Sequence, residues 1–283
     1  MLTSMKVVFD IHIINELYFS RKGSISAVTI FIHTLTIAKP FQNCCFFILA
    51  LATAYLVITG RPSSNGVKTE ILDISNPSMS CLLDDTTYRY GSQGGLLGST
   101  PVICGGYDGS INDLSECLFY GTSQVISMNF KRRSHSSVAI NSSMHWIMGG
   151  YKAGGYNGKL HLDSTEFITT GGAINGPTLP EGVSHSCAVK FPDTGDVYLA
   201  GGLTYHTNRI NNVWVSNPSN EFTFTQGPSL ITARFEHACG TMSIGAKSII
   251  VAVGGRDSSD NLLASVEILD PMSNQWVAGK MNI

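Results

Sequence analysis

Three histidines recur in similar surroundings along the chain, and histidine can act as a general base or bind a metal ion. They are His135, His185 and His237. Because a catalytic residue is needed once whereas a structural residue is needed in every copy of a repeat, the recurrence favours a structural role. The same argument applies to four glutamates that open apolar or aromatic runs, for which we expect hydrogen bonds within or between repeated units: Glu70, Glu116, Glu166 and Glu267.

Other candidates for chemistry carry less weight. The glycine-rich segment at residues 154–159 ends in a lysine, but it lacks the spacing of a phosphate-binding loop and the Ser or Thr after the lysine. The sequence has no Ser-His-Asp order and no Cys-x-x-Cys pair. We therefore expect no catalytic, cofactor-binding or metal-binding residue, and no cofactor.

The charge pattern argues against polyanionic partners. Charged residues make up 13% of the chain and the net charge is −2, so there is no electrostatic case for binding nucleic acid or an anionic membrane surface. The one basic cluster is Lys131-Arg132-Arg133, which we expect in a solvated connection.

Five short apolar runs, each stopped by a glycine or a glycine pair, must position these residues. Each run is too short for a helix and predicts a buried strand followed by a tight turn. The anchoring glycines are Gly60, Gly105 with Gly106, Gly149 with Gly150, Gly201 with Gly202, and Gly254 with Gly255. The last glycines of the runs follow one another at intervals of 44 to 53 residues, which indicates one supersecondary unit used repeatedly.

A histidine, a glycine pair, a glutamate and a closing tryptophan, Trp276 in the last unit, follow one another in a constant order. This order resembles the kelch repeat over residues 55–283. The resemblance implies an all-β fold, a kelch-type β-propeller with about five recognisable four-stranded antiparallel blades around a channel. Two units depart from the pattern, because Thr59 replaces a glycine in the first and Trp214 replaces the glutamate in the fourth.

The sequence does not decide whether the blades close into a ring. Five anchors are fewer than the six or seven blades usual in this family, within a range of about 4–8. After the last anchor the chain supplies a glutamate strand and Trp276 but no further histidine strand, and a unit that begins at Tyr55 lacks that strand too. We expect an open or incomplete ring, or sequence missing at the C-terminus.

Residues 1–54 form an N-terminal extension ahead of the repeats. An apolar run at residues 44–51, followed by Ala52-Thr53-Ala54, has the features of a secretory signal peptide with cleavage after Ala54. A signal anchor is the second interpretation, and only an uncleaved anchor would attach the chain to a membrane. The third is that residues 46–58 belong to a propeller strand.

The cysteines and one sequon bear on the compartment. Cys104 and Cys117 lie on consecutive strands joined by a hairpin, so we predict a disulfide across the ladder, as an oxidising compartment permits. Cys187 and Cys239 each follow a histidine by two residues, and we expect equivalent positions in neighbouring blades with two buried thiols rather than a bridge. Asn141 opens the sequon Asn-Ser-Ser in a predicted exposed turn.

The preferred function is a non-catalytic protein-binding module, secreted or at the cell surface, that contacts a protein partner through the loops after the glycine anchors. These loops are residues 107–111, 151–161, 203–210 and 256–261. The alternatives are an intracellular kelch substrate adaptor in the cytoplasm, an actin-associated fragment and, on fold analogy alone, an enzyme resembling galactose oxidase or the sialic acid epimerases. Cleavage after Ala54 and a glycan on Asn141 would distinguish the secreted module from the others.

Overall fold

The computed structural model describes residues 89–110, 112–156, 159–205, 208–244 and 247–280, together with the backbone of five strands nearer the N-terminus. These strands are β1 (Phe19–Arg21), β2 (Ser24–Ser26), β3 (Tyr55–Ile58), β4 (Thr69–Asp73) and β5 (Leu82–Asp85). The predicted signal peptide with its cleavage point after Ala54, the anchor Gly60 and Cys81 lie outside the described residues.

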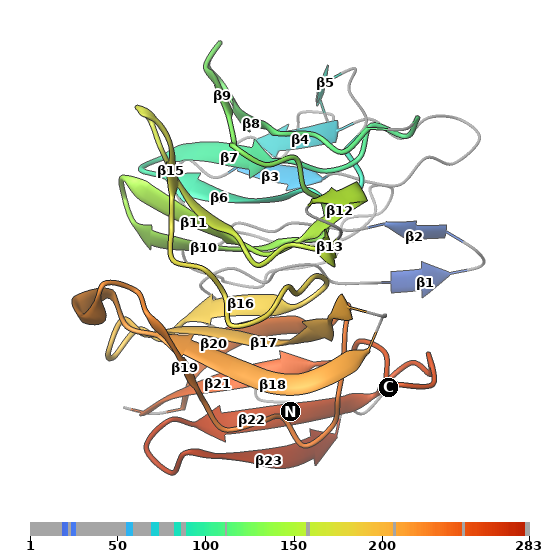
Figure 1. The fold of residues 1–283 in the computed structure, drawn as a ribbon, viewed down its shortest axis with the longest axis vertical. Helices are drawn as coiled ribbons and strands as arrows, with labels where there is room; N and C mark the ends of the chain where they lie inside the picture. The colour runs from blue at the N-terminus through green and yellow to red at the C-terminus, as the bar shows by residue number, and fades with distance from the viewer. Residues whose placement is uncertain are drawn as a thin grey trace, which may run out of the picture.

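The chain is an all-β structure in which four sheets of four antiparallel strands follow one another (Figure 1). The second blade contains β6 (Gln93–Leu97), β7 (Thr100–Cys104), β8 (Glu116–Phe119) and β9 (Val125–Ser127). The third contains β10 (Ser136–Asn141), β11 (Met144–Met148), β14 (Thr165–Thr169) and β15 (Gly172–Asn175). The fourth contains β16 (Cys187–Lys190), β17 (Val197–Leu203), β18 (Arg209–Ser216) and β19 (Phe224–Gln226). The fifth contains β20 (Ala238–Ile244), β21 (Lys247–Val253), β22 (Ser265–Asp270) and β23 (Gln275–Lys280).

The first blade differs, because its described strands are the three of the sheet β3-β4-β5. In it β3 carries the anchor run and β4 carries Glu70, whose Cα lies opposite that of Ile58. Among the described residues, β3 is the edge strand on the inner side of this sheet. A further hairpin, β12 (Tyr151–Tyr156) with β13 (Lys159–His161), extends from the third blade between β11 and β14.

Apolar side chains fill the spaces between blades, because each sheet has two faces to cover. Between the third and fourth blades Trp146 is fully buried and stacks on Phe167 and Phe224, with ring centroids 5.2 and 5.3 Å apart. Between the fourth and fifth blades Trp276 belongs to the same buried apolar cluster as Val213, and its indole N–H donates to the Pro228 carbonyl at 2.8 Å. The inner strands contact one another in chain order, β6 with β10, β10 with β16 and β16 with β20.

The glycine pairs join each blade to the next. The N–H of the second glycine donates to a carbonyl at the start of the following blade, at 2.7 to 2.9 Å for Gly106, Gly150 and Gly202. A Cβ on the first glycine of these three pairs would lie 2.3 to 2.5 Å from that same carbonyl, and these glycines have φ near +60°. Only glycine fits both the close approach and the backbone angle.

Among the described residues, no helix has the length and apolar character needed to cross a bilayer.

Candidate functional site

One end of the blade series brings four equivalent backbone segments together, where the inner strands begin and the glycine-anchored strands end. Each segment forms a β-bridge with the residue that follows a glycine pair: Tyr90 with Tyr107, Arg133 with Tyr151, Ser184 with Leu203, and Phe235 with Arg256. The next residue in each segment has φ between 49° and 68°, in the left-handed region: Gly91, Ser134, His185 and Glu236. The amide of each of the last three donates to the carbonyl of the preceding member at 2.7 to 3.0 Å, so the blades are linked in series here.

This register corrects the predicted equivalence of the three histidines. His135 and His237 occupy the same position, which is taken by Ser92 in the second blade and Ser186 in the fourth. His185 lies one position earlier and is equivalent to Ser134 and Glu236. The prediction that His185 repeats the other two was therefore wrong by one residue, because similar local sequence does not specify the bridge partner.

A small cavity opens within this end of the blades. It is lined by Gln93, Ser134, His135, His185, Ser186, Glu236 and His237. The His135 and His237 side chains are buried, and their ring nitrogens, like Oε1 of buried Gln93, have no hydrogen-bond partner in the structure. Burial and the nearby Arg234 lower the pKa of His237 to about 3, and burial with Arg132 holds the pKa of His135 well below its usual value. Both rings are therefore neutral at pH 7.

Glu236 is the one charged residue among those lining the cavity. Burial raises the pKa of its carboxyl, and Arg256, whose Nε lies 3.4 Å from Oε2, acts in the opposite direction. Next to it, His185 Nδ1 and His161 Nδ1 both contact Ser184 Oγ, at 2.8 and 2.9 Å. Burial, followed by His161 and Arg133, lowers the pKa of His185 to about 4.

Arginines and aromatic rings lie next to the residues that line the cavity, since Arg133 precedes Ser134 and Phe235 precedes Glu236. The Arg133 guanidinium lies between the rings of Tyr107 and Tyr151, 4.8 and 4.6 Å from their centroids, and pairs with Asp113 at 2.9 Å. Arg209 lies 5.2 Å from the Phe235 ring centroid. Such Arg-aromatic contacts contribute on the order of 1 kcal/mol each at part-exposed sites.

Aspartate side chains close two of the predicted loops after the glycine anchors. In the segment after Gly106, the Asp108 carboxylate accepts hydrogen bonds from the side-chain and backbone amides of Asn112 and from the backbone amide of Ser110, which lower its pKa. In the segment at residues 256–261, the Asp257 carboxylate likewise accepts hydrogen bonds from the amides of Ser259 and Asn261.

The other two predicted loops contain strand residues. Residues 151–161 include the hairpin β12-β13, and residues 203–210 overlap the end of β17 and the start of β18. The segment between strands in the fourth blade is therefore shorter than predicted.

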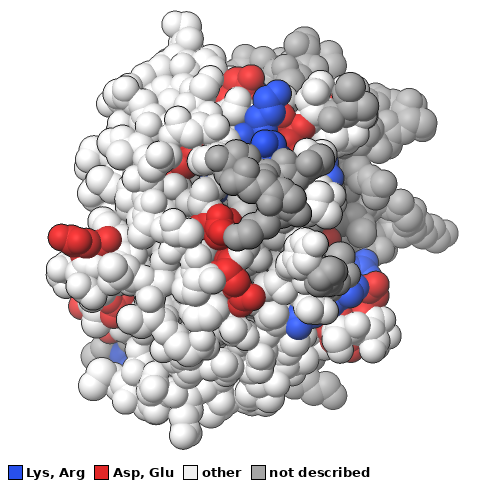
Figure 2. Space-filling view, in the orientation of Figure 1, with Lys and Arg blue, Asp and Glu red and all other residues white. Residues whose placement is uncertain are grey.

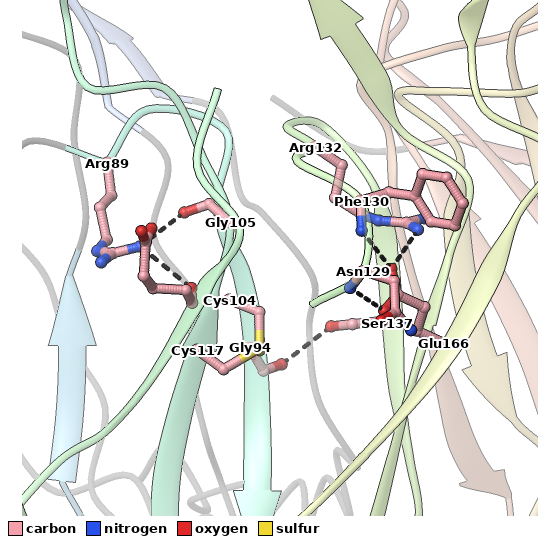
Figure 3. The surroundings of a disulfide bond; sticks show 11 residues. Arg89, Gly94, Cys104, Gly105, Cys117, Asn129, Phe130, Arg132, Ser137 and Glu166 are labelled. Atoms are coloured by element: carbon pink, nitrogen blue, oxygen red, sulfur yellow. Dashed lines mark hydrogen bonds and ion pairs between the residues drawn. A yellow bond between two sulfur atoms is a disulfide. The ribbon is translucent and has the colours of Figure 1, made fainter. Parts of the chain in front are cut away.

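Two of the four glutamates form buried ion pairs that the sequence did not suggest, and Figure 3 shows the one between Arg132 and Glu166. The fully buried Arg132 and Glu166 side chains lie 2.7 Å apart, and Glu166 also accepts the amides of Asn129 and Phe130. Arg234 and Glu267 repeat this arrangement at 2.5 Å. Each pair ties the segment entering a blade to that blade's third strand. The recurrence of an arginine three residues before His135 and His237 was the signal for it.

These pairs correct two sequence interpretations. Arg132 is buried rather than part of a solvated connection. The carbonyl of Glu116 accepts the amide of Gly105, as the carbonyls of Ser164 and Ser265 accept those of Gly149 and Gly254. Glu116 is thus equivalent to Ser164, which lies two residues before Glu166, and is not the equivalent of Glu166.

The fourth blade exchanges the ion pair for two apolar side chains. Trp214 lies opposite Leu199 and occupies the glutamate position, as the sequence indicated, while Val183 replaces the buried arginine. Because an ion pair can be replaced by well-packed apolar groups, the two changes compensate each other.

Cys104 and Cys117 lie directly opposite each other on β7 and β8 and form a disulfide (Figure 3). A second disulfide joins Cys187 of the fourth blade to Cys239 of the fifth, so the prediction of two separate thiols was wrong. The reason is the strand register. Cys187 lies opposite Ala200, which directly precedes the glycine pair of the fourth blade. Cys239 lies opposite Ala252, which is separated from the glycine pair of the fifth blade by one residue. Since a shift of one residue turns a strand side chain to the other face, the two cysteines point at each other.

Asn141 is exposed and is the last residue of β10, directly before the turn that leads into β11. Its Oδ1 accepts hydrogen bonds from the amide and the hydroxyl of Ser143, at 2.8 and 2.9 Å. This turn is at the end of the blade opposite the cavity. Within the described part of the chain, no group of three or more His, Cys, Asp or Glu side chains is arranged to hold a metal ion.

Residues 246–280, which include β21 to β23, match the family model described as Kelch motif. No curated protein matches the chain significantly. The match lies in the fifth blade and is consistent with the kelch resemblance inferred from the order of the repeated residues.

Proposed function

We propose that this kelch-repeat chain is a non-catalytic protein-binding module, secreted or displayed at the cell surface, which binds its partner with the end of the blades that surrounds the cavity. We call this end the loop face and define it by the described segments that follow the glycine pairs, at residues 107–110, 151–156, 159–161, 203–205, 208–209 and 256–262. The observation that carries the proposal is the Arg133 guanidinium held between Tyr107 and Tyr151.

Arginine and tyrosine are enriched among the residues that dominate binding energy in protein interfaces. On the loop face they are pre-positioned, because Asp113 fixes Arg133 and the Asp108 and Asp257 carboxylates close their own turns. A surface that is already ordered loses less conformational entropy on binding.

The same face carries exposed apolar side chains, of which Tyr205 is 52% and Leu262 is 70% exposed. Figure 2 views the blades across their strands, and the acidic and basic side chains visible there form small separate groups. A partner would therefore be held mainly by aromatic, apolar and hydrogen-bonding contacts.

Paired substitutions test the location of the binding surface. The double variant Tyr205→Ser with Leu262→Ser alters the loop face, and the matched control Val125→Ser with Ile174→Ser alters residues of the outer strands that are 54% and 57% exposed. Each purified chain is screened against an array of cell-surface and matrix proteins. We expect partners retained by the control to be lost by the loop-face variant. Equal retention by both variants would refute the loop face as the binding surface.

The extracellular part of the proposal is supported by the two disulfides and by the exposed sequon at Asn141. Disulfides persist mainly in oxidising compartments. A glycan on Asn141 would extend from the end of the blades opposite the loop face and leave binding unobstructed. Intact-mass analysis of protein from the medium and from the lysate of eukaryotic cells tests this. A species found only in the lysate, with no glycan and with reduced cysteines, would overturn it.

A further inference from the structure

We propose that His161, Ser184 and His185 form an acid latch, which holds the base of the β12-β13 hairpin against the fourth blade at neutral pH and releases it when the histidines bind protons. The inference rests on the proposed function and deepens it, because the hairpin belongs to the loop face and its release would weaken partner binding in acid.

The three residues form a cluster that the other described blades do not repeat. Ser184 Oγ lies between the two rings, 2.9 Å from His161 Nδ1 and 2.8 Å from His185 Nδ1. The position of Ser184 carries larger side chains in the other four-stranded blades: Tyr90, Arg133 and Phe235. A residue that recurs in every blade is explained by the fold, whereas a polar cluster that occurs once is a candidate for function.

The acid latch closes the base of the β12-β13 hairpin. The Cα of His161 lies opposite that of Tyr151, and the amide of Val183 donates to the Leu162 carbonyl at 3.2 Å. The Tyr151 ring packs edge-on against the His161 ring, with centroids 5.7 Å apart, and also contacts the Arg133 guanidinium. A displacement of His161 would therefore disturb the arginine-tyrosine contact of the loop face.

The shared hydroxyl requires two neutral rings of opposite tautomer. Ser184 is fully buried, and a hydroxyl has one proton to donate and two lone pairs that accept. It can donate to Nδ1 of one ring while it accepts from a protonated Nδ1 of the other. If the accepting ring binds a proton, its Nδ1 becomes a donor and the buried hydroxyl loses its acceptor. Protonation therefore disfavours the closed arrangement.

The surroundings also disfavour a charged histidine. Burial, followed by His161 and Arg133, lowers the pKa of His185 to about 4, and burial lowers the pKa of His161. Other titratable side chains beside the acid latch are a tyrosine on β12 and three residues of the cavity lining: Tyr151, His135, His237 and Glu236. Of these only Glu236 would favour a charged histidine, and Arg256 already pairs with it.

These values set the direction and size of the pH effect. A histidine released into water binds its proton near pH 6.5, so between that value and pH 4 the open state holds more protons than the closed state. Opening is therefore favoured as the pH falls. For His185 alone, the ratio of open to closed forms rises about twentyfold between pH 7 and pH 5.

The tautomers of the two rings test the geometry. The full chain is labelled with ¹⁵N-histidine, and the ring nitrogens of His161 and His185 are observed at pH 7. We expect one ring to be protonated at Nδ1 and the other at Nε2. Two rings protonated only at Nε2 would overturn the proposal, because Ser184 has a single proton to donate, and so would two charged rings.

Hydrogen exchange between pH 7 and pH 5, corrected for its intrinsic pH dependence, tests the release. We expect the opening equilibrium reported by the amides of Leu162 and Val183 to rise about twentyfold relative to that of the β14 amides. In His185→Asn, Oδ1 replaces Nδ1 as an acceptor and does not titrate, so most of this rise should disappear. The control His145→Leu leaves the acid latch intact and should keep the rise. No rise in the natural chain, or an equal rise in His185→Asn, would contradict the proposal.

Partner binding is measured separately. A partner retained by the control variant in the array should dissociate from the natural chain at pH 5 more readily than from His185→Asn, and equal dissociation would refute control of binding by the acid latch. If the loop-face variant keeps every partner, the proposed function fails, while the tautomer and exchange results still decide whether the acid latch exists.

Discussion

Acid should destabilise this protein through its buried histidines, and His145 shows the effect most simply. Its side chain is fully buried in β11, with its ring against Gly95 of the neighbouring blade, and burial lowers its pKa to about 4. In the unfolded chain the same residue binds a proton near pH 6.5. Between these two values the unfolded state holds more protons, so the free energy of unfolding falls as the pH falls; above pH 6.5 the full stability is present.

The size of the effect follows from the shift. One residue with these two pKa values lowers the free energy of unfolding by about 2 kcal/mol between pH 7 and pH 5. His185 and His237, whose pKa values are about 4 and about 3, add similar amounts, for a total of about 6 kcal/mol. The raised pKa of Glu236 acts in the opposite sense, because the folded state then holds the extra proton. A loss of this size is comparable with the whole stability of an ordinary domain, about 5–15 kcal/mol.

Urea unfolding followed by tryptophan fluorescence at pH values from 7.5 to 5 measures this dependence. The variant His145→Leu removes one titrating group and replaces an imidazole without hydrogen-bond partners by an apolar side chain. We expect its free energy of unfolding to change with pH less steeply than that of the natural chain, by about 1 kcal/mol per pH unit near pH 5.5. An identical pH slope in the two proteins would refute the assignment of acid sensitivity to buried neutral histidines.

Three further predictions concern the contacts between and within blades. Glu166→Gln leaves its buried arginine partner without a counter-charge and should lower the free energy of unfolding by about 3 kcal/mol, measured by urea unfolding at pH 7; a loss below about 1 kcal/mol would show that the pair is not desolvated. Gly105→Ala should cost about 3 kcal/mol, from left-handed backbone strain and a Cβ 2.4 Å from a carbonyl, whereas Gly121→Ala, at φ +78° in open space, should cost about 1 kcal/mol in the same assay; equal costs would contradict the role of close approach. Cys187→Ser opens a crosslink to Cys239 that spans 52 residues and should lower the free energy of unfolding by about 4 kcal/mol under oxidising conditions; with reductant present, the two proteins should unfold alike, and a persistent difference would count against the crosslink.

The sequence by itself determined the architecture, because the relevant signals are local. A short apolar run closed by a glycine pair specifies a strand and a turn, and its recurrence specifies the blade. Within one hairpin the sequence also placed Cys104 opposite Cys117, since the register of adjacent strands follows from the turn between them. The sequence also indicated that Trp214 occupies the glutamate position, because this assignment depends only on the order of residues within one repeat.

The residue contacts between neighbouring blades were decided only by the tertiary structure. A shift of one residue separates His185 from His237 and turns Cys239 toward Cys187, and local sequence similarity does not reveal such a shift. The pairing of Arg132 with Glu166 and the cavity beside Glu236 likewise join segments tens of residues apart. These features depend on how neighbouring sheets pack, and that packing is set by the summed contacts of two blades rather than by the pattern within either one.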